Sequence, residues 1–216
     1  MKILIAQPVH EGGILQLRKD IENNEDVDLV IYPEGYICDE ILLEDTCKLA
    51  RLHNTMIITS YKKDFKDRAL IIDKDGNKIL ERWKTPAEFK CELYEPLVVE
   101  TNKLCIGYLL CMEILKGYRD LEKANRKIDF IVHPIGVGMF SNEQFNLWIN
   151  EAKRIAKKYN TMIIGTSHAD GSYRNCGISI PISYCIDKSG EEIYISKSDT
   201  RTRIIDLNTK TIIERG

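Results

Sequence analysis

The sequence of 216 residues lacks the cysteine and histidine spacing that metal sites and disulfide frameworks require. Its seven cysteines are odd in number and include no Cys-x-x-Cys pair, and its four histidines are scattered. Because ligands do not cluster, we expect no metal site. Because the cysteines do not pair, we expect reduced thiols, most of them buried as small apolar side chains. Such cysteine usage is typical of a reducing compartment and predicts a cytoplasmic location.

The sequence also has no long apolar run and no block of like charge. Its most apolar window, residues 130–140, is short and contains His133 and Pro134, so it cannot span a bilayer. The apolar part of residues 1–7 is too short for a signal peptide and indicates a first strand. With 31 basic and 33 acidic side chains the net charge is −2. We therefore expect neither a membrane nor nucleic acid as a partner.

The sequence does have enough apolar material for a sizeable core. Hydrophobic residues make up 44% of the chain, which at this length predicts one domain over residues 1–216. Runs of Val, Ile and Leu without polar alternation indicate strands buried on both faces, and apolar residues at helical spacing indicate helices between them. The expected strands are 2–7, 28–33, 55–60, 68–73, 78–83, 97–100, 103–110, 129–133, 161–166, 178–186, 190–195 and 201–206. The expected helices lie near 13–24, 40–53, 115–126 and 142–159, the last of them capped by Ser141.

The second half of the chain repeats the first. Asn54-Thr-Met-Ile-Ile58 recurs letter for letter at residues 160–164. Three further segments match at similar offsets: 2–6 with 103–107, 28–33 with 129–134, and 73–79 with 187–193. Four matches in register predict a duplicated unit. Two β-rich halves, each with helices on one face, can bury their bare faces against each other. The sequence therefore predicts an α/β protein, an α-β-β-α sandwich with two internally similar halves.

Three polar residues, Glu34, Lys84 and Cys111, each follow directly after a predicted strand. Side chains at strand ends can converge at one edge of a sheet. A carboxylate there could take the proton of a thiol, and a lysine cation could stabilise the oxyanion that forms when the thiol attacks. The counterpart of Glu34 in the second half is Ile135, which carries no acid. We therefore expect one site and not two.

In this order the three residues resemble the Glu-Lys-Cys triad of the nitrilase superfamily, and the resemblance runs along nearly the whole chain. It implies a nitrilase-like α-β-β-α fold, a single carbon–nitrogen hydrolase domain, no cofactor, and a homodimer or higher homo-oligomer. It also implies hydrolysis through a thioester on Cys111, with Glu34 as the base, Lys84 as the cation and the backbone N–H of Met112 as an oxyanion donor. The expected substrate is a small linear amide or carbamoyl compound. A nitrile, processed by the same triad, is the alternative.

The superfamily commonly carries a second glutamate shortly after the lysine. Glu92, eight residues after Lys84, is taken as the fourth catalytic residue, with Glu88 as the next candidate and Glu95 also available. Glu113 resembles the acid of the family's Cys-aromatic-acid turn and is expected to support the loop through backbone hydrogen bonds. Loops at strand ends supply the expected pocket residues, which are Tyr36, Pro134, Ile135, Gly136 and His168. His168 is better explained as a hydrogen-bonded loop histidine.

Two other interpretations stay open. A catalytically silent module of this fold could bind a ligand or partner, although binding alone requires no thiol beside a base and a cation. A Cys–His hydrolase could use Cys111 with His133 or His168, although it leaves Glu34 and Lys84 unexplained. The chain is also shorter than typical members of the superfamily. Short pocket loops predict an open, shallow site, or one completed by a partner subunit.

Overall fold

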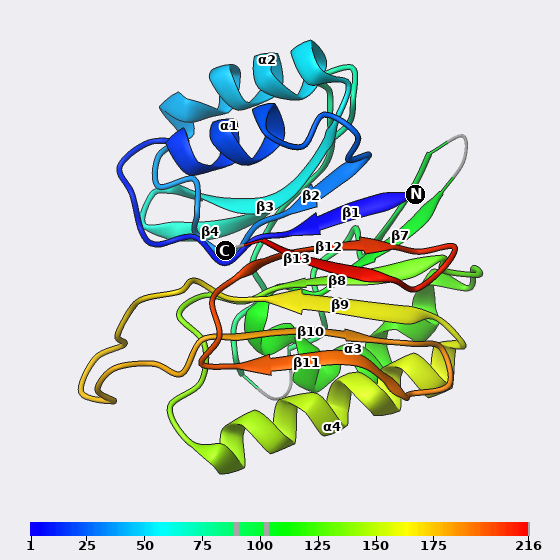
Figure 1. Cartoon of the computed structure of the whole chain (residues 1–216). Helices are drawn as coiled ribbons and strands as arrows, with labels where there is room; N and C mark the ends of the chain where they lie inside the picture. Colours follow the sequence, from blue (N-terminus) through cyan, green and yellow to red (C-terminus); the bar gives the residue numbers. More distant parts are fainter. Residues whose placement is uncertain (89–90, 102–103, 216) are drawn as a thin grey trace.

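The strands of the protein form two sheets that pack face to face, with helices on the outer face of each (Figure 1). This is a computed structural model that describes residues 1–88, 91–101 and 104–215. The start of the strand predicted at 103–110 lies outside the described residues. The observed layers are those of an α-β-β-α sandwich, so the predicted fold class is confirmed.

The first half of the chain builds most of a seven-stranded sheet with the order β13-β12-β1-β2-β3-β4-β5. The three strands β1, β2 and β3 run parallel, and the remaining neighbours are antiparallel. Two helices cover the outer face (Figure 1). The bounds are β1 (Lys2–Ile5), α1 (Leu15–Glu22), β2 (Leu29–Ile31), η1 (Glu40–Leu42), α2 (Leu43–His53), β3 (Met56–Lys63), β4 (Lys66–Ile72), β5 (Lys78–Trp83), β12 (Thr202–Asp206) and β13 (Ile212–Arg215).

The second half builds a six-stranded sheet with the order β11-β10-β9-β8-β7-β6. Here β7, β8 and β9 are the parallel strands. Helices α3 and α4 cover the outer face, and the Ser141 hydroxyl caps α4 by accepting from the N–H of Gln144 at 3.1 Å. The bounds are β6 (Val98–Glu100), β7 (Cys105–Tyr108), η2 (Cys111–Glu113), α3 (Ile114–Asp120), η3 (Leu121–Ala124), β8 (Phe130–Pro134), α4 (Asn142–Tyr159), β9 (Met162–Thr166), β10 (Ile182–Ile186) and β11 (Glu192–Lys197).

The duplication seen in the sequence is repeated in the backbone. The order β1 to β5 in one sheet matches β7 to β11 in the other. Asn54 and Asn160 both end a helix in the left-handed conformation, at φ of 51° and 49°, before the chain enters a strand. Asp73 and Asp187 each accept hydrogen bonds from two backbone N–H groups of the hairpin turn that follows. The repeated letters therefore encode the same caps and turns in both halves.

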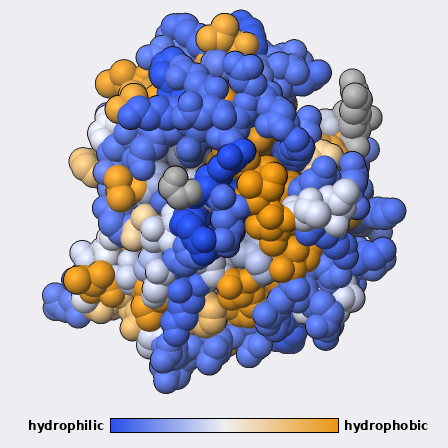
Figure 2. All heavy atoms as spheres, in the orientation of Figure 1, coloured by the Kyte–Doolittle hydropathy of each residue, from blue (hydrophilic) through white to orange (hydrophobic). Residues whose placement is uncertain are grey.

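Three apolar layers hold the sandwich together. One lies between the sheets, one between the first sheet and α1 and α2, and one between the second sheet and α3 and α4. Trp148, on α4, is buried in the last of these. The central strands β2, β7, β8 and β10 are buried on both faces, which explains why their sequences are mostly apolar. Figure 2 shows a mostly polar outer surface, with apolar side chains gathered in a band across the middle of this face.

The structure differs from the predicted elements mainly near the carboxyl-terminal third. The strand predicted at 178–186 begins only at Ile182, and residues 167–181 form a long loop that projects beyond the ends of the strands (Figure 1). The strand β13 was not predicted, and it pairs with β12 at the edge of the first sheet. It has only two apolar residues, Ile212 and Ile213, before Glu214 and Arg215, so the sequence signal is weak. Among the described helices, none is both long enough and apolar enough to cross a membrane.

Candidate active site

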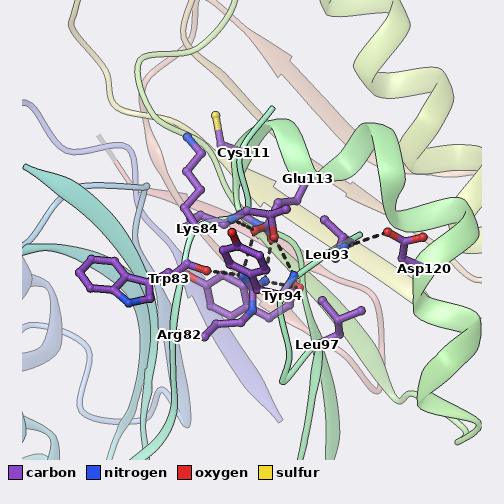
Figure 3. A network of polar contacts seen from close by, with 12 residues as sticks. Arg82, Trp83, Lys84, Leu93, Tyr94, Leu97, Cys111, Glu113 and Asp120 are labelled. Carbon is purple, nitrogen blue, oxygen red and sulfur yellow. Dashed lines mark hydrogen bonds and ion pairs between the residues drawn. The ribbon is translucent and has the colours of Figure 1, made fainter. Parts of the chain in front are cut away.

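The three residues of the proposed triad lie together at the strand ends. Glu34 follows β2, Lys84 follows β5, and Cys111 begins η2 just after β7. The ammonium Nζ of Lys84 lies 2.5 Å from Oε1 of Glu34. The Cys111 thiol lies close enough to the Glu34 carboxylate for each group to shift the pKa of the other. In Figure 3 the Lys84 amine and the Cys111 sulfur project to the same side of the view. A carboxylate, an ammonium group and a thiol thus share one site.

Glu34 is a buried carboxylate whose backbone is held by the second half of the chain. Its side chain is only 7% exposed, and its N–H donates to the carbonyl of Ile135 at 3.1 Å. Burial raises the pKa of Glu34, an effect that Lys84 opposes. Within the described residues, Oε1 makes no hydrogen bond beyond the ion pair with Lys84. A buried carboxylate with a raised pKa is a better proton acceptor than an exposed one.

Cys111 sits in a strained turn that aims its sulfur into the site. Its φ is 54°, in the left-handed region that residues with a β-carbon rarely adopt. The backbone N–H of Gly136 donates to its sulfur. Burial, followed by the negative charge of Glu34, raises the pKa of the thiol to about 12, although Lys84 acts in the opposite direction. The resting sulfur is therefore a protonated thiol that needs a base before it can attack.

Lys84 stays a cation in spite of its partly buried position. Burial alone would lower its pKa, but the charge and hydrogen bond of Glu34 and the charge of Asp67 act in the opposite direction, and the pKa lies above its ordinary value. The backbone N–H of Lys84 donates to the carbonyl of Asp67 on β4 at 2.9 Å, which extends the β4–β5 ladder to the site. The lysine thus enters the site from a fixed main chain.

The loop after β8 closes over the base. A β-carbon built on Gly136 would lie 3.0 Å from Oε2 of Glu34, so only a glycine permits this approach without displacing the carboxylate. Pro134 and Ile135, which precede Gly136, are buried in the second sheet and its core. Of the three predicted loop residues, Gly136 is therefore the one that lies against the Glu34 carboxylate, while Ile135 contacts only the main chain of Glu34.

Two buried histidines hold the main chain of the base and of the thiol residue. Nε2 of His133 lies 2.8 Å from the carbonyl oxygen of Cys111, and Nε2 of His168 lies 3.1 Å from that of Glu34. A carbonyl can only accept, so both Nε2 atoms carry the proton. The hydroxyl of Tyr184 donates to Nδ1 of His133 at 2.5 Å. Burial lowers the pKa of both rings to about 4. Both histidines are therefore neutral at physiological pH.

Glu113 is the centre of a buried network beneath the thiol turn (Figure 3). Its carboxylate accepts from both Nη atoms of Arg82, at 2.8 and 2.6 Å, and both side chains are buried. It also accepts from the N–H groups of Thr85 and Leu110, each at 2.8 Å. The residue after Lys84 and the residue before Cys111 are thereby tied to one carboxylate. Arg82 was not predicted as a residue of this network, because in the sequence it is only a charged residue within a predicted strand.

The second glutamate predicted after the lysine is not in the site. Glu92 is 69% exposed and pairs with Lys123 on the surface. Glu88 is exposed as well, and Glu95 turns its carboxylate to the N–H of Leu97. A count of eight residues from Lys84 does not locate the second glutamate, because the connection between β5 and β6 places the Glu92 side chain on the surface. The choice of Glu92 is therefore corrected.

Tyr36 is also not a pocket residue. It is buried against α1, where its hydroxyl donates to the carboxylate of Glu11 and accepts from the N–H of Leu17 at 2.9 Å. Both hydrogen-bonding functions of the hydroxyl are used inside the protein. The prediction rested on the position of Tyr36 after a strand. Side chains at such positions can also point toward the helix layer, as that of Tyr36 does.

Two features of the site were missed in the sequence. The first is Asp67 on β4, whose charge acts on both Glu34 and Lys84. The second is a group of possible metal ligands formed by His10, His168 and Asp170, whose ligand atoms lie within 4.8 Å of one another. The two histidine rings stack, with centroids 3.8 Å apart and 11° between their planes. Parallel rings cannot both direct an in-plane lone pair at one ion without a rotation, so we assign this group no metal.

A cavity of about 560 Å³ lies near the site but contains none of the three triad residues. Its charged side chains are already paired, Arg68 with Glu81 and Arg82 with Glu113. We therefore assign the chemistry to the strand ends and not to this cavity. The cavity is lined by Arg68, Glu81, Arg82, Trp83, Tyr94 and Glu95.

Comparison with known proteins agrees with this architecture. No protein-family model and no curated relative matches the sequence. The carbon–nitrogen hydrolase from Helicobacter pylori G27 superposes with a TM-score of 0.73 at 16% identity, over 97% of this chain and 90% of its own. An amidase from Nesterenkonia sp. gives 0.74 at 13% identity, over 96% and 90%. The NitFhit protein of C. elegans gives 0.73 at 17% identity, over 97% and 61%. The chain therefore has the nitrilase fold.

Proposed function

We propose that this chain is a thiol amidohydrolase of the nitrilase superfamily that cleaves a small linear amide or carbamoyl compound. The observation that carries the proposal is the shared site of Glu34, Lys84 and Cys111, in which the carboxylate contacts both the cation and the thiol. The fold neighbours that are named as amidases and as a carbon–nitrogen hydrolase support the same reaction class.

The first half of the reaction forms a thioester. Glu34 takes the proton of the Cys111 thiol while the sulfur attacks the carbonyl carbon of the amide. The carbonyl oxygen becomes an oxyanion, which the Lys84 ammonium and the N–H of Met112 stabilise. Met112 lies in the first turn of η2, where backbone N–H groups have no partner within the helix. The C–N bond then breaks, and the proton on Glu34 passes to the nitrogen, which leaves as ammonia or an amine.

The second half of the reaction hydrolyses the thioester. Glu34, again ionised, takes a proton from water as the water oxygen attacks the acyl carbon. The C–S bond breaks, the carboxylic acid leaves, and the proton on Glu34 returns to the sulfur of Cys111. The net change is the addition of one water to one amide, so the protein needs no oxidant or reductant. A nitrile would enter the same cycle through a thioimidate.

The raised pKa of the thiol explains why the site would need all three groups. A thiol with a pKa of about 12 gives almost no thiolate at neutral pH, so proton removal and attack must occur together. The Cys–His alternative is disfavoured because Nε2 of His133 and of His168 donates to a carbonyl oxygen and not to the sulfur. From the resemblance to the nitrilase superfamily we further infer a homodimer or higher homo-oligomer, which light scattering would measure.

The test is an amide and nitrile panel read by ammonia release. We expect turnover of at least one small amide, its loss in Cys111→Ala, and near-native rates in Cys105→Ala, where the substituted thiol lies at the start of β7 away from the triad. We expect Glu34→Gln to lose about a thousandfold, because the general base is absent. A protein that binds panel members without releasing ammonia would instead be a silent binding module.

A covalent probe gives a second measurement of the same proposal. A variant of the Nesterenkonia amidase carries the acetamide moiety of fluoroacetamide covalently added at its active-site cysteine. We expect fluoroacetamide to modify Cys111 of this chain before its other six cysteines. Modification spread over exposed Cys38 and Cys176 with Cys111 spared would contradict the proposal.

A further inference from the structure

A second carboxylate, that of Asp67, lies beside the Glu34–Lys84 ion pair. The carbonyl of Asp67 accepts from the N–H of Lys84 at 2.9 Å, so the two residues are neighbours on the β4–β5 ladder. A β-carbon built on Gly35 would lie 3.2 Å from Oδ1 of Asp67, which places this oxygen against the residue that follows Glu34. Asp67 is therefore in contact with the main chain of Lys84, and its carboxylate lies beside Gly35, the residue that follows Glu34.

The carboxylate of Asp67 does not have the full set of hydrogen bonds that a structural buried carboxylate normally has. Its Oδ1 is buried and has no hydrogen-bond partner among the described residues. The cations that face it are Lys84, from the end of β5, and Lys62, from β3. Both lie beyond direct ion-pair distance and act on it through space. A buried carboxylate oxygen without a donor is costly, so its presence beside a reactive site indicates a role there.

We propose that Asp67 is a positioning residue of this site, whose fixed negative charge keeps Glu34 a strong base and holds Lys84 as a cation while Glu34 is neutral. This inference rests on the proposed function. When Glu34 takes the proton of Cys111, the Glu34–Lys84 ion pair loses its negative member. The Asp67 charge remains, and Lys84 still faces an anion during the step in which it must stabilise the oxyanion.

The charges around Glu34 have the signs that this role requires. The groups that face its carboxylate are Lys84 from β5, Asp67 from β4 and Cys111 from η2, while His168 contacts only its main chain. Burial is the main effect that raises the pKa of Glu34, Lys84 opposes it, and the negative charge of Asp67 raises it further. The same charge raises the pKa of Lys84.

The experiment measures the alkylation rate of Cys111 by iodoacetamide against pH, with the labelled residue identified by mass spectrometry. The variant is Asp67→Asn, and the matched control is Asp64→Asn, an exposed aspartate in the turn before β4 at a φ of 49° that asparagine also tolerates. If Glu34 loses about half a pKa unit, the plateau rate above its pKa falls about threefold and the acid limb moves to lower pH.

The shapes of the two pH–rate curves distinguish the loss of the Asp67 charge from a structural defect in the variant. At a pH well below the pKa of Glu34, the alkylation rate should be the same in Asp67→Asn and native protein. In the variant Glu34 is a weaker base, but a larger fraction of it is ionised, and the two effects cancel. The Asp67→Asn and native curves should therefore merge at low pH and differ at the plateau. Asp67→Glu, which keeps the charge, should restore the plateau, and Asp67→Ser, a second neutral variant, should repeat the Asn curve.

Two results would overturn the inference. One is an Asp67→Asn curve that coincides with the Asp64→Asn curve at every pH. The other is a rate lowered by the same factor at every pH, which indicates a structural defect. Alkylation requires no substrate, so this result stands apart from the amide panel. Native protein that turns over no amide but shows the predicted curves would refute the proposed function and leave the role of Asp67 intact.

Discussion

At the scale of single residues, the site depends on main-chain positions that two buried histidines of the second half hold in place. His133 and His168 bind the carbonyl oxygens of Cys111 and Glu34, the residues that carry the proposed nucleophile and base. Both rings are buried and neutral, with a pKa lowered to about 4 by burial. Protonation would add a buried charge at each of these positions.

This arrangement predicts that acid destabilises the protein through its histidines. A histidine with a folded pKa of about 4 and an unfolded pKa of 6.5 stabilises the fold above pH 6.5, and the contribution is lost as pH falls toward 4. Between about pH 7.5 and about pH 5 the loss is about 2 kcal/mol for His133. Urea unfolding across this range should show that much less pH dependence in His133→Gln, whose amide can replace both hydrogen bonds.

The control for this prediction is His53→Gln, a half-exposed histidine at the end of α2. Its free energy of unfolding should vary with pH as the native protein does. Equal pH dependence in native protein and His133→Gln would show that the buried ring does not govern acid stability.

The sequence predicted some residues of the site better than others, for a physical reason. Glu34, Lys84 and Cys111 could be selected because each ends a strand, and strand ends of one sheet edge meet. Glu92 was selected by its offset within a connection, and an offset says nothing about the path of a loop. Asp67 is the second residue of β4. A charged residue near the start of a strand usually faces solvent, so there was no reason in the sequence to select it.

At the scale of elements, the two halves contribute different chemistry to one site. The loop after β2 supplies the acid of Glu34, and the equivalent loop after β8 supplies only backbone groups, the N–H of Gly136 and the carbonyl of Ile135. The repeat in the sequence predicted this pair of loops and the single acid. It could not predict that the second loop contacts the first, because that contact depends on how the two sheets are packed.

The loop after β8 should be sensitive to a single methyl group. In Gly136→Ala the new β-carbon would meet Oε2 of Glu34 at 3.0 Å and displace the carboxylate. We expect the rate of Cys111 alkylation to fall about tenfold with little change in the melting temperature. Gly12→Ala is the matched control, because a β-carbon at Gly12 would meet nothing within 4 Å. A native alkylation rate in Gly136→Ala would show that this approach is not needed.

At the scale of the whole molecule, the two sheets meet through an apolar layer with a few polar links. The Arg82–Glu113 ion pair joins the end of β5 in one sheet to η2 beside the other. The hydroxyl of Thr166 donates to the carbonyl of Ala6 across the same interface at 2.6 Å. The sandwich could be predicted from two bare apolar faces, but these links could not, because each joins residues distant in sequence.

The buried ion pair predicts a large stability effect when one partner is removed. Glu113→Ala leaves the Arg82 guanidinium buried and two backbone N–H groups without an acceptor, so the free energy of unfolding should fall by about 3–5 kcal/mol. Urea unfolding measures it. The control, Glu122→Ala, removes an acid that is 70% exposed and paired with Lys158, and should change stability little. A small loss in Glu113→Ala would mean that this ion pair contributes little to holding the two sheets together.

The left-handed turn at Cys111 has one more consequence. Folding alone would favour a glycine at this position, because the β-carbon is what makes the conformation unfavourable. The chain keeps a cysteine against that preference, and so gives up some conformational stability at the position where the sulfur lies beside Glu34 and Lys84. The positive φ of Cys111 is thus a position where the need for a reactive side chain outweighs the preference of the backbone for glycine.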